Sequence, residues 1–514
     1  MVRQMVFCVS LLMAVNCLGQ TTNKARQGYE QFKKQARQGY VDFRRACNDD
    51  YAAFLKQAWL SYEAGPVVPR PKEREVKPVV MPQGDVDKPV KPMPVKVDTV
   101  IAPVPQGAQP KPVAPIYEGT VENEQQLSFT FFGTEGRVRM PALRPDIGAV
   151  LKGGVSENEV SKGWTMLSEG GFGHLIRDCL GLRMRHQLCD WAYLLMLRKM
   201  SESYYGGDAN ASTLFLAWVY CQSGYQMRLG SNGQRLYLLF GSRHQIYDHA
   251  FFRIDGNYFY PLVDKGETAI TRLRICGAAF PEEQPLSLYI PSAMSLANNF
   301  SDNRTIRSKR YPSVKAQVRV NRNLIDFYDV YPTSAIDDNP LTRWAMYANT
   351  PMAENVKSQL YGKMRQLISG KSQIEAANML IDWVQTGLVY EYDYKVWGGD
   401  RAFFAEETLY YPYCDCEDRA ILFTRMVRDL LGLKCILVYY PNHLACAVGF
   451  DQAVQGDYVV VGGRRFVIAD PTYIGAPVGR TMPDMDNSSA QVIMLEKSSV
   501  YGNSICDRRQ STSE

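Results

Sequence analysis

The stretch of residues 410–473 limits the fold more than any other part of the chain, because it sets one helix and several strands in a fixed order. Apolar residues recur at helical spacing after Cys416, and Gly432 stands where a glycine commonly ends a helix. The helical apolar positions are Ile421, Leu422, Met426, Val427, Leu430 and Leu431. The strand-like runs that follow are 435–440, 444–450, 458–461 and 466–468. This stretch therefore predicts an α+β unit.

Cys416, His443 and Asp470 form a candidate catalytic set within this stretch. The cysteine lies on the first helical turn, where free backbone N–H groups and the helix dipole favour a thiolate. The histidine begins a strand and can accept the thiol proton, while the aspartate follows the last strand and can hold the other ring nitrogen. Three acidic neighbours cap the helix but disfavour a negative sulfur, so the histidine must overcome them. They are Asp415, Glu417 and Asp418.

A purely structural interpretation competes with the catalytic one, because cysteines are often buried in cores and histidines occur in turns. A redox pair of Cys414 and Cys416 is a further alternative. The chain has only 5 histidines, however, and His443 is the only one after residue 249. Its place between the cysteine and the Asp470-Pro471 pair favours the catalytic interpretation.

With these residues the chain resembles the transglutaminase-like superfamily, the papain-type fold of transglutaminases and related bacterial cysteine peptidases. The matching positions are Cys416, Asp418, Ala420, Gly432, His443, Asp470, Pro471 and Thr472. The resemblance extends upstream through residues 352–392, which resemble the helix before the family's core. The chain departs from the pattern at Leu444, where the family has an aromatic residue, and at Cys414-Asp415, which replace a glycine. The resemblance therefore leaves the type of substrate open.

The resemblance implies an enzyme in which Cys416 attacks an amide carbonyl, His443 transfers the proton and Asp470 orients the histidine. The acyl-thioester then passes to water, as in a peptidase or amidase, or to an amine, as in a crosslinking acyltransferase. Hydrolysis is the favoured outcome, and the choice between a protein and a cell-wall peptide as substrate stays open. The Cys416 N–H is expected to hold the oxyanion. Candidates for the substrate cleft, by position alone, are Trp397, Tyr411, Tyr413 and Cys414.

Residues 1–19 have the pattern of a secretory signal peptide, with Arg3 before an apolar run. A lipid anchor on Cys17 is the lesser alternative, because Asn16 precedes it. No later apolar run is long enough to span a bilayer. A net charge of +5 on 514 residues, without interleaved basic and aromatic residues, argues against nucleic acid as a partner. We therefore expect a secreted, periplasmic or envelope-associated protein.

Of the 12 cysteines, two lie in the predicted signal peptide, so ten remain in the mature chain. They form no CxxC pairs and have no histidine-rich surroundings, so neither a zinc site nor another metal or cofactor is expected. Spread over nearly the whole chain, they do not form a compact disulfide framework either. Individual disulfides stay open.

Residues 25–62 contain an eleven-residue repeat whose apolar stripe advances by three, four and four positions. The stripe comprises Tyr29, Phe32, Ala36, Tyr40, Phe43, Cys47, Tyr51, Phe54, Ala58 and Tyr62. Eleven residues in three turns keep the stripe on one helical face. The helix can lie on its own protein, self-associate as a coil, or dock on a partner or envelope surface. Residues 20–64 are thus assigned to one long helix.

Residues 65–116 carry 13 of the 28 prolines, mixed with valine and lysine. Such a composition predicts an extended spacer that builds no core of its own. A helix followed by a stiff spacer suggests that the catalytic part reaches away from an attachment point. A ligand for proline-binding domains is the less favoured interpretation.

Residues 117–266 resemble a weaker copy of the C-terminal unit. A shift of 208 positions aligns four apolar or glycine positions of the two helices and puts Asp208 where Cys416 stands. His249 and Asp264 follow in the same order as the catalytic pair, so we expect a degenerate transglutaminase-like domain without a nucleophile. Residues 267–335 are expected to be a β-rich connector, 336–496 the catalytic domain and 497–514 a tail.

The sequence thus predicts an α+β protein with a papain-like catalytic domain at its C-terminus and a degenerate second copy before it. The favoured function is an exported cysteine peptidase or amidase. The alternative is a non-catalytic envelope scaffold or adhesion protein that uses the same folds as binding surfaces.

Overall fold

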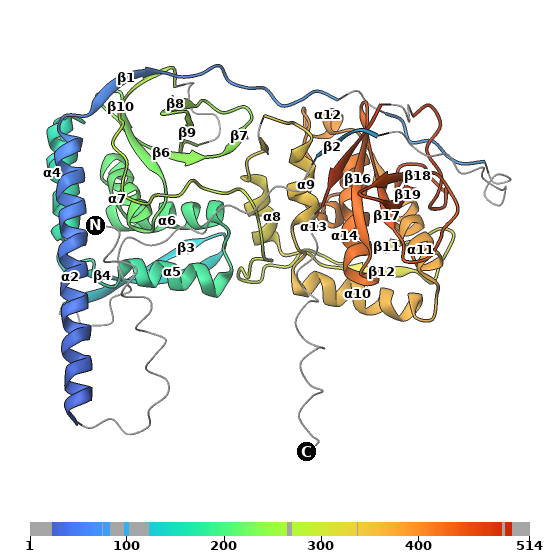
Figure 1. The fold of residues 1–514 in the computed structure, drawn as a ribbon, viewed down its shortest axis with the longest axis horizontal. Coiled ribbons are helices and arrows are strands. Elements are labelled where there is room, and N and C mark those ends of the chain that lie inside the picture. The colour runs from blue at the N-terminus through green and yellow to red at the C-terminus, as the bar shows by residue number, and fades with distance from the viewer. Residues whose placement is uncertain are drawn as a thin grey trace.

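The computed structural model describes residues 23–73, 76–82, 97–101, 123–264, 270–336, 338–485 and 489–495. Within these ranges the chain mixes helices and curled sheets, which confirms the α+β expectation at that coarse level. Two lobes lie side by side, each around a six-stranded sheet (Figure 1). The predicted signal peptide and the predicted tail lie outside the described residues.

The N-terminal lobe is centred on α7 (Ala209–Gln222), which is buried from Ala211 to Gln222 except at Thr213. The Asp208 side chain caps this helix by accepting from the Ala211 N–H at 2.9 Å. The other helices of the lobe are α3 (Ile147–Leu151), α4 (Glu157–Glu169), α5 (Leu175–His186) and α6 (Asp190–Tyr205). Its sheet contains β1 (Trp59–Glu63), β5 (Met227–Ser231), β6 (Leu236–Ser242), β8 (Phe252–Ile254), β9 (Asn257–Pro261) and β10 (Arg272–Cys276). A hairpin of β3 (Glu124–Phe131) and β4 (Thr134–Pro141) packs beside α5 and α6.

The C-terminal lobe is centred on α14 (Cys416–Leu431), which is buried from Cys416 to Arg428. Gly432 ends this helix in the left-handed conformation, with φ of 68°, as its sequence position predicted. The other helices are α9 (Thr342–Asn349), α10 (Glu354–Ile368), α11 (Gln373–Gly387), α12 (Asp393–Val396) and α13 (Ala405–Tyr410). The sheet contains β2 (Val97–Ile101), β16 (Lys434–Tyr440), β17 (His443–Gly449), β18 (Tyr458–Val461), β19 (Arg464–Ala469) and β20 (Ala490–Met494). The predicted helix and strands of residues 416–468 are therefore present in the predicted order.

The two large sheets have the same strand order when the strand after α7 is matched to the strand after α14. The orders are β8-β9-β6-β5-β10-β1 and β18-β19-β17-β16-β20-β2. Every pairing is antiparallel in both sheets except at one edge, where β2 runs parallel to β20 and β1 antiparallel to β10. In both lobes an edge strand from the N-terminal hundred residues completes the sheet.

The long helix α2 (Asn23–Leu55) is shorter than its repeat predicted, because the chain turns after Leu55 and residues 59–63 form β1. Its C-terminal part packs on its own lobe beside α4, where Tyr51 and Leu55 are buried. Nearer its N-terminus, Tyr29 and Phe32 are exposed, as is Phe54 close to its C-terminal end. The expected stripe is therefore buried at Tyr51 but exposed at other positions along the helix.

The segment assigned to a spacer takes part in the fold, which corrects the expectation that residues 65–116 only connect. Residues 97–101 form β2 at the edge of the C-terminal sheet. Residues 76–82 lie against the same lobe, where Met81 is buried in a small apolar cluster with Tyr473 and Met482. Backbone pairing and one buried side chain are enough to hold a proline-rich segment in place.

The connector assigned to residues 267–335 is not β-rich throughout and does not stand apart. It contributes β10 to the N-terminal sheet and forms the helix α8 (Arg322–Asp329). Its two-stranded pieces are β11 (Arg304–Arg307) with β12 (Lys315–Val318), and β13 (Ser334–Ile336) with β7 (His244–Ile246). The β7–β13 pair ties the connector back to the N-terminal lobe.

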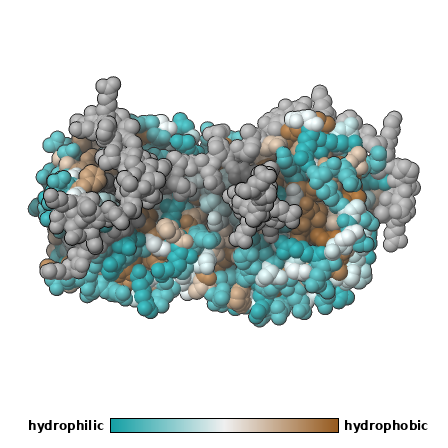
Figure 2. Space-filling model, turned by 60° about the horizontal axis from the view of Figure 1, so that its bottom comes forward, coloured by the Kyte–Doolittle hydropathy of each residue, from teal (hydrophilic) through white to brown (hydrophobic). Residues whose placement is uncertain are grey.

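The face seen in Figure 2 is mostly hydrophilic, with exposed apolar side chains gathered in a few patches. Among the helices that the structure describes, none combines the length and the apolarity needed to cross a bilayer.

Candidate active site

Cys416 is the first residue of α14, and the segment before it holds that end of the helix in place. Asp418 accepts hydrogen bonds from the backbone N–H of Asp415 at 3.2 Å and of Phe403 at 2.8 Å. A short parallel pair of β14 (Val389–Tyr390) and β15 (Tyr413–Cys414) leads the chain into the helix. The thiol therefore occupies the predicted first-turn position, with only 8% of the residue exposed.

His443 and Asp470 meet at the start of β17. A tight connection through Asn442, with φ of 66°, pairs Tyr440 with His443 and begins the strand there. Asp470 follows β19 directly, and its Oδ2 lies 2.8 Å from His443 Nε2. The other ring nitrogen, Nδ1, is buried without a hydrogen-bond partner in the described part of the chain. The carboxylate thus fixes the ring and leaves one nitrogen available.

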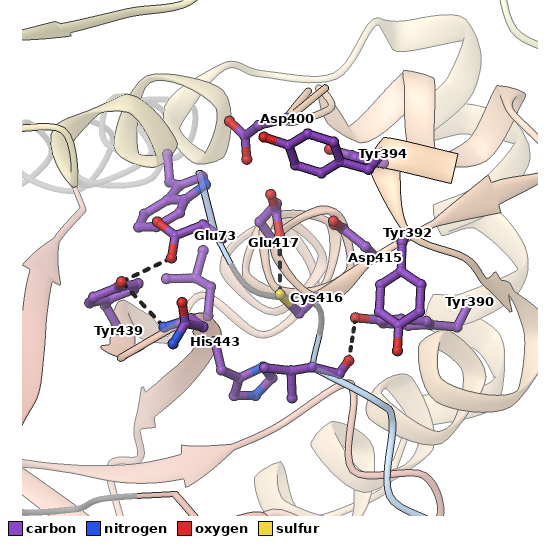
Figure 3. A pocket seen from close by; sticks show the side chains of 15 residues that line it. Glu73, Tyr390, Tyr392, Tyr394, Asp400, Asp415, Cys416, Glu417, Tyr439 and His443 are labelled. Carbon is purple, nitrogen blue, oxygen red and sulfur yellow. Dashed lines mark hydrogen bonds between the residues drawn. The ribbon is translucent and has the colours of Figure 1, made fainter. Parts of the chain in front are cut away.

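One pocket brings Cys416 and His443 together, as expected from their order in the sequence (Figure 3). The other residues that line it are Glu73, Val76, Trp344, Tyr390, Tyr392, Asp393, Tyr394, Asp400, Asp415, Glu417, Tyr439, Asn442 and Leu444. Asp470 lies behind His443, away from the pocket surface. A thiol and an imidazole thus share one pocket, and a carboxylate binds the other side of the imidazole.

The Cys416 sulfur makes its hydrogen bond to an acidic neighbour. It donates to Glu417 Oε2 at 3.1 Å, not to the His443 ring. Burial, followed by the charges of Glu417 and Asp415, raises the pKa of Cys416 well above that of an ordinary thiol, while the Leu444 backbone N–H lowers it. The influence of Leu444 indicates that the sulfur lies near the start of β17. Transfer of the thiol proton to His443 would therefore require the sulfur to give up its hydrogen bond to Glu417 and to turn toward the His443 ring.

A cluster of buried carboxyl groups surrounds the thiol, and the sequence revealed only part of it. Asp393 and Asp400 join the acidic residues at the start of α14. Burial first, and then the charge of Glu417, raise the pKa of Asp393 to about 9 and that of Asp400 to about 7. Burial likewise raises the pKa of Asp415 and Asp418. Several members are therefore neutral acids at neutral pH, which reduces the charge that opposes a thiolate.

The same cluster contains the residues best suited to hold a cation. The acidic oxygens of Asp393, Asp400 and Glu417 lie within 4.8 Å of one another, and so do the potential ligand atoms of Asp415, Cys416 and Glu417. Protonation relieves the repulsion between these carboxylates equally well, and the raised pKa values favour it. The geometry alone therefore does not require a metal.

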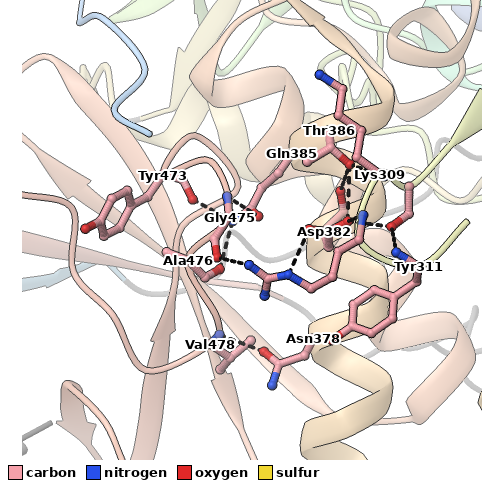
Figure 4. A network of polar contacts seen from close by, with 12 residues as sticks. Lys309, Tyr311, Asn378, Asp382, Gln385, Thr386, Tyr473, Gly475, Ala476 and Val478 are labelled. Atoms are coloured by element: carbon pink, nitrogen blue, oxygen red, sulfur yellow. Dashed lines mark hydrogen bonds and ion pairs between the residues drawn. The ribbon is translucent and has the colours of Figure 1, made fainter. Parts of the chain in front are cut away.

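A buried glutamine on α11 holds the loop that carries Asp470 (Figure 4). Gln385 Nε2 donates to the backbone oxygens of Asp470, Tyr473 and Ala476 at 2.8–3.1 Å, and its Oε1 accepts from Gly475 N at 3.0 Å. Since the carbonyl groups of Asp470, Tyr473 and Ala476 belong to buried residues, one side chain satisfies most of the turn. The position of Asp470, and through it of His443, therefore depends on α11.

The four residues proposed for the substrate cleft do not line this pocket. Trp397 and Tyr411 pack together with Arg401 in a separate aromatic group, with ring centroids 4.8 Å apart. Tyr413 is 41% exposed on β15, and the Cys414 thiol donates to Val389 O at 3.6 Å. Closeness in sequence to the cysteine was not enough, because the chain turns away from the pocket before β15.

The three residues assigned to a degenerate first-lobe site have separate local partners. Asp208 caps α7, His249 Nε2 contacts Pro261 O at 3.1 Å, and Asp264 pairs with Arg198 at 2.8 Å. By strand order, His443 at the start of β17 corresponds to Leu236 at the start of β6, not to His249. The positional shift of 208 therefore aligned the helices to within one residue of their starts, at Ala209 and Cys416, but not the site residues.

The pocket residues that sequence reasoning missed come from four separate segments. They are Glu73, Trp344, Tyr390, Tyr392, Asp393, Tyr394, Asp400 and Tyr439. The run of tyrosines and aspartates at 390–400 was the one available signal, since so many polar aromatic and acidic residues rarely gather in a core. Glu73 gave none, because it lies more than 340 residues from the cysteine.

The nine cysteines in the described ranges are all free thiols. A comparison with family models, curated proteins and solved structures gives no match to this chain.

Proposed function

We propose that the chain is a transglutaminase-like cysteine enzyme, a peptidase or amidase, in which Cys416 is the nucleophile, His443 the base and Asp470 its orienting partner. The observation that carries the proposal is the His443 ring, which is fixed at Nε2 by Asp470 and has a free Nδ1 in the pocket that holds the thiol. The common strand order of the two lobes supports the further proposal that the N-terminal lobe is a second copy of a papain-like unit.

In the proposed reaction, His443 Nδ1 takes the thiol proton as the sulfur attacks the amide carbonyl of the substrate. The Cys416 backbone N–H stabilises the oxyanion, and the imidazolium then protonates the leaving amine. Water attacks the acyl-thioester, gives its proton to the imidazole, and releases a carboxylic acid and the thiol. An amine in place of water would give a new amide instead. Export by a signal peptide belongs to the same proposal.

Thiol reactivity tests the proposal without a known substrate. Purified protein is treated with iodoacetamide from pH 5 to 9, and the modified cysteines are mapped by mass spectrometry. We expect Cys416 to label below pH 7 ahead of the other thiols, and a His443→Ala variant to lower its rate by about 10-fold or more. Cys435 and Cys446, both buried in the same lobe, are internal controls for unfolding. A labelling rate of Cys416 that does not change in the His443→Ala variant would contradict the proposed enzymatic function.

A non-catalytic scaffold is the second candidate, and one observation favours it. The Cys416 thiol is buried and hydrogen-bonded to Glu417, and its pKa is raised, as expected for an inert cysteine. The same labelling experiment separates the two candidates, because a scaffold predicts that Cys416 reacts no faster than the buried Cys435.

A further inference from the structure

Residues 70–73 and 76–81, here called the strap, lie along the pocket that holds Cys416. The strap comes from β1 in the N-terminal lobe and runs along the C-terminal lobe (Figure 1). Glu73 lines the pocket beside the Tyr439 hydroxyl (Figure 3), and Val76 lines it as well. Cys416, in the same pocket, is only 8% exposed.

The strap is bound through its backbone, as an extended peptide would be. Tyr390 donates its hydroxyl to Val76 O at 3.0 Å. Met81 N donates to Ile474 O at 2.9 Å, and Ile474 N donates to Val79 O at 2.8 Å, which makes a parallel bridge. Ile474 belongs to the loop that carries Asp470. The groove therefore offers hydrogen-bond partners to the backbone of an extended chain, and these partners end beside the residues proposed as catalytic.

One side chain of the strap is recognised by charge. Glu73 Oε1 lies 3.2 Å from Arg343 Nη2, and Glu73 Oε2 accepts from the Tyr439 hydroxyl at 3.0 Å. The Arg343 side chain is fully buried, and its guanidinium stacks on Trp344. Its other acidic neighbour, Asp400, is more distant at 3.8 Å. Because a buried cation is costly without an anion, this subsite requires an acidic group.

We propose that the strap occupies the substrate groove of the Cys416 site, and that this groove takes an extended peptide with an acidic side chain in the Arg343–Tyr439 subsite. The inference rests on the proposed function of that site. A substrate must displace the strap to reach the sulfur, so the chain in this state is self-blocked. Water that enters with displacement lowers the desolvation of the thiol and favours its ionisation.

Opening the strap tests the first half of the proposal in the full-length chain. A Glu73→Ala/Met81→Asp double variant removes the acidic anchor and puts a charge into the apolar cluster of Met81. We expect iodoacetamide to label Cys416 about 10-fold faster or more, since each lost anchor is worth a tenfold change in the closed population. The control is Lys77→Gln, an exposed strap position, which should label as the wild type does.

Two results of this experiment are decisive. An unchanged Cys416 rate in the double variant would overturn the strap as a cover. Faster labelling of Cys435 and Cys446 as well would report unfolding, and the Glu73→Gln single variant, which preserves side-chain size, then decides the question by its Cys416 rate. Adding His443→Ala to the opened variant separates the two proposals. If opening raises the Cys416 labelling rate and His443→Ala does not change that rate, the strap proposal stands and the proposed enzymatic function is wrong.

A synthetic peptide of residues 70–81 tests the second half. Measured by fluorescence anisotropy, it should bind the opened variant saturably and the wild type at least about 10-fold more weakly, because the tethered strap competes. A peptide in which glutamine replaces the glutamate of position 73 should bind about 10-fold more weakly, as should the original peptide to an opened Tyr439→Phe variant. Equal binding of the acidic and the amide peptide would overturn the acidic subsite.

Discussion

The two lobes have large sheets of the same strand order, but their residues differ at the three element ends that form the candidate site. In the C-terminal lobe these positions are the start of α14, the start of β17 and the residue after β19. The corresponding pairs are Cys416 and Ala209, His443 and Leu236, and Asp470 and Leu262. The N-terminal lobe thus has a similar framework but lacks the cysteine, the histidine and the aspartate at these three positions.

The difference teaches that topology supplies positions, while a few residues at element ends decide whether they become a site. Ala209 is exposed at the start of α7, where no carboxyl cluster surrounds it in the described residues. Four cysteines of this lobe, Cys179, Cys189, Cys221 and Cys276, are instead buried in the core. Burial is the largest cause that raises the pKa of Cys189 to about 12. In the C-terminal lobe the thiol borders a polar pocket.

The largest expected effects test whether each lobe has its own core. Trp218 on α7 and Trp383 on α11 are both fully buried, so each Trp→Ala variant should lose about 3–5 kcal/mol of unfolding free energy. Pulsed thiol labelling in urea locates the loss, because buried cysteines occur in both lobes. We expect Trp218→Ala to expose Cys179 first and Trp383→Ala to expose Cys446 first. Simultaneous exposure in both variants would show that the lobes unfold as one unit.

A smaller effect on stability is expected at two buried glutamines, Gln385 and Gln222, which bind different parts of the fold. Gln385 holds the Asp470 loop, whereas Gln222 binds Asn48 of α2 at 3.2 Å. Each Gln→Ala change should cost about 2–3 kcal/mol in urea unfolding, because buried polar groups lose their partners. Only Gln385→Ala should also change the dependence of Cys416 labelling on pH, since it releases the loop behind His443. An equal change in Gln222→Ala would contradict the separate roles.

The acidic cluster predicts a pH dependence that belongs to the C-terminal lobe. The folded pKa of Asp393, about 9, lies above the unfolded value near about 3.9, so the folded state binds an extra proton between them. Stability from this group is complete below the unfolded pKa and is lost as the pH rises through about 9. Asp393→Asn should therefore reduce the loss of unfolding free energy between pH 6 and 9 by up to about 4 kcal/mol, the value for one proton over three pH units.

Urea unfolding at pH 6, 7.5 and 9 measures this slope, and Asp451→Asn, at an exposed position, is the matched control. An unchanged slope in Asp393→Asn would mean that the carboxylate is already ionised in the folded protein. A bound cation would then be the alternative to protonation, and its removal by a chelator should change the stability of the wild type.

The smallest effect is expected from placing a thiol at the corresponding position of the N-terminal lobe. Ala209→Cys should leave stability within about 0.5 kcal/mol, because the site is exposed. Its alkylation should follow the pH profile of an ordinary thiol, since Leu236 and Leu262 offer neither base nor carboxylate. Labelling of this cysteine below pH 7 at the rate of Cys416 would show that the helix start alone activates a thiol.

Sequence patterns predicted the parts of the fold that depend on local periodicity. The helix from Cys416 to Gly432 and the strands after it were predicted because apolar spacing and glycines act over a few residues. The ends of α2 and the role of the proline-rich segment were not, because they depend on what lies across the lobe. Residues 97–101, for example, form the strand β2 by pairing with β20, which lies far away in the sequence.

For the candidate site, the sequence by itself singled out the candidates for nucleophile, base and orienting carboxylate, because their order follows the order of the helix and strands that present them. Only the tertiary structure decided what surrounds them. It brought Asp393, Asp400 and Glu73 to the thiol from distant segments and put the predicted aromatic cleft residues elsewhere. Burial and the electric field of such neighbours depend on distance in space, which no local pattern encodes.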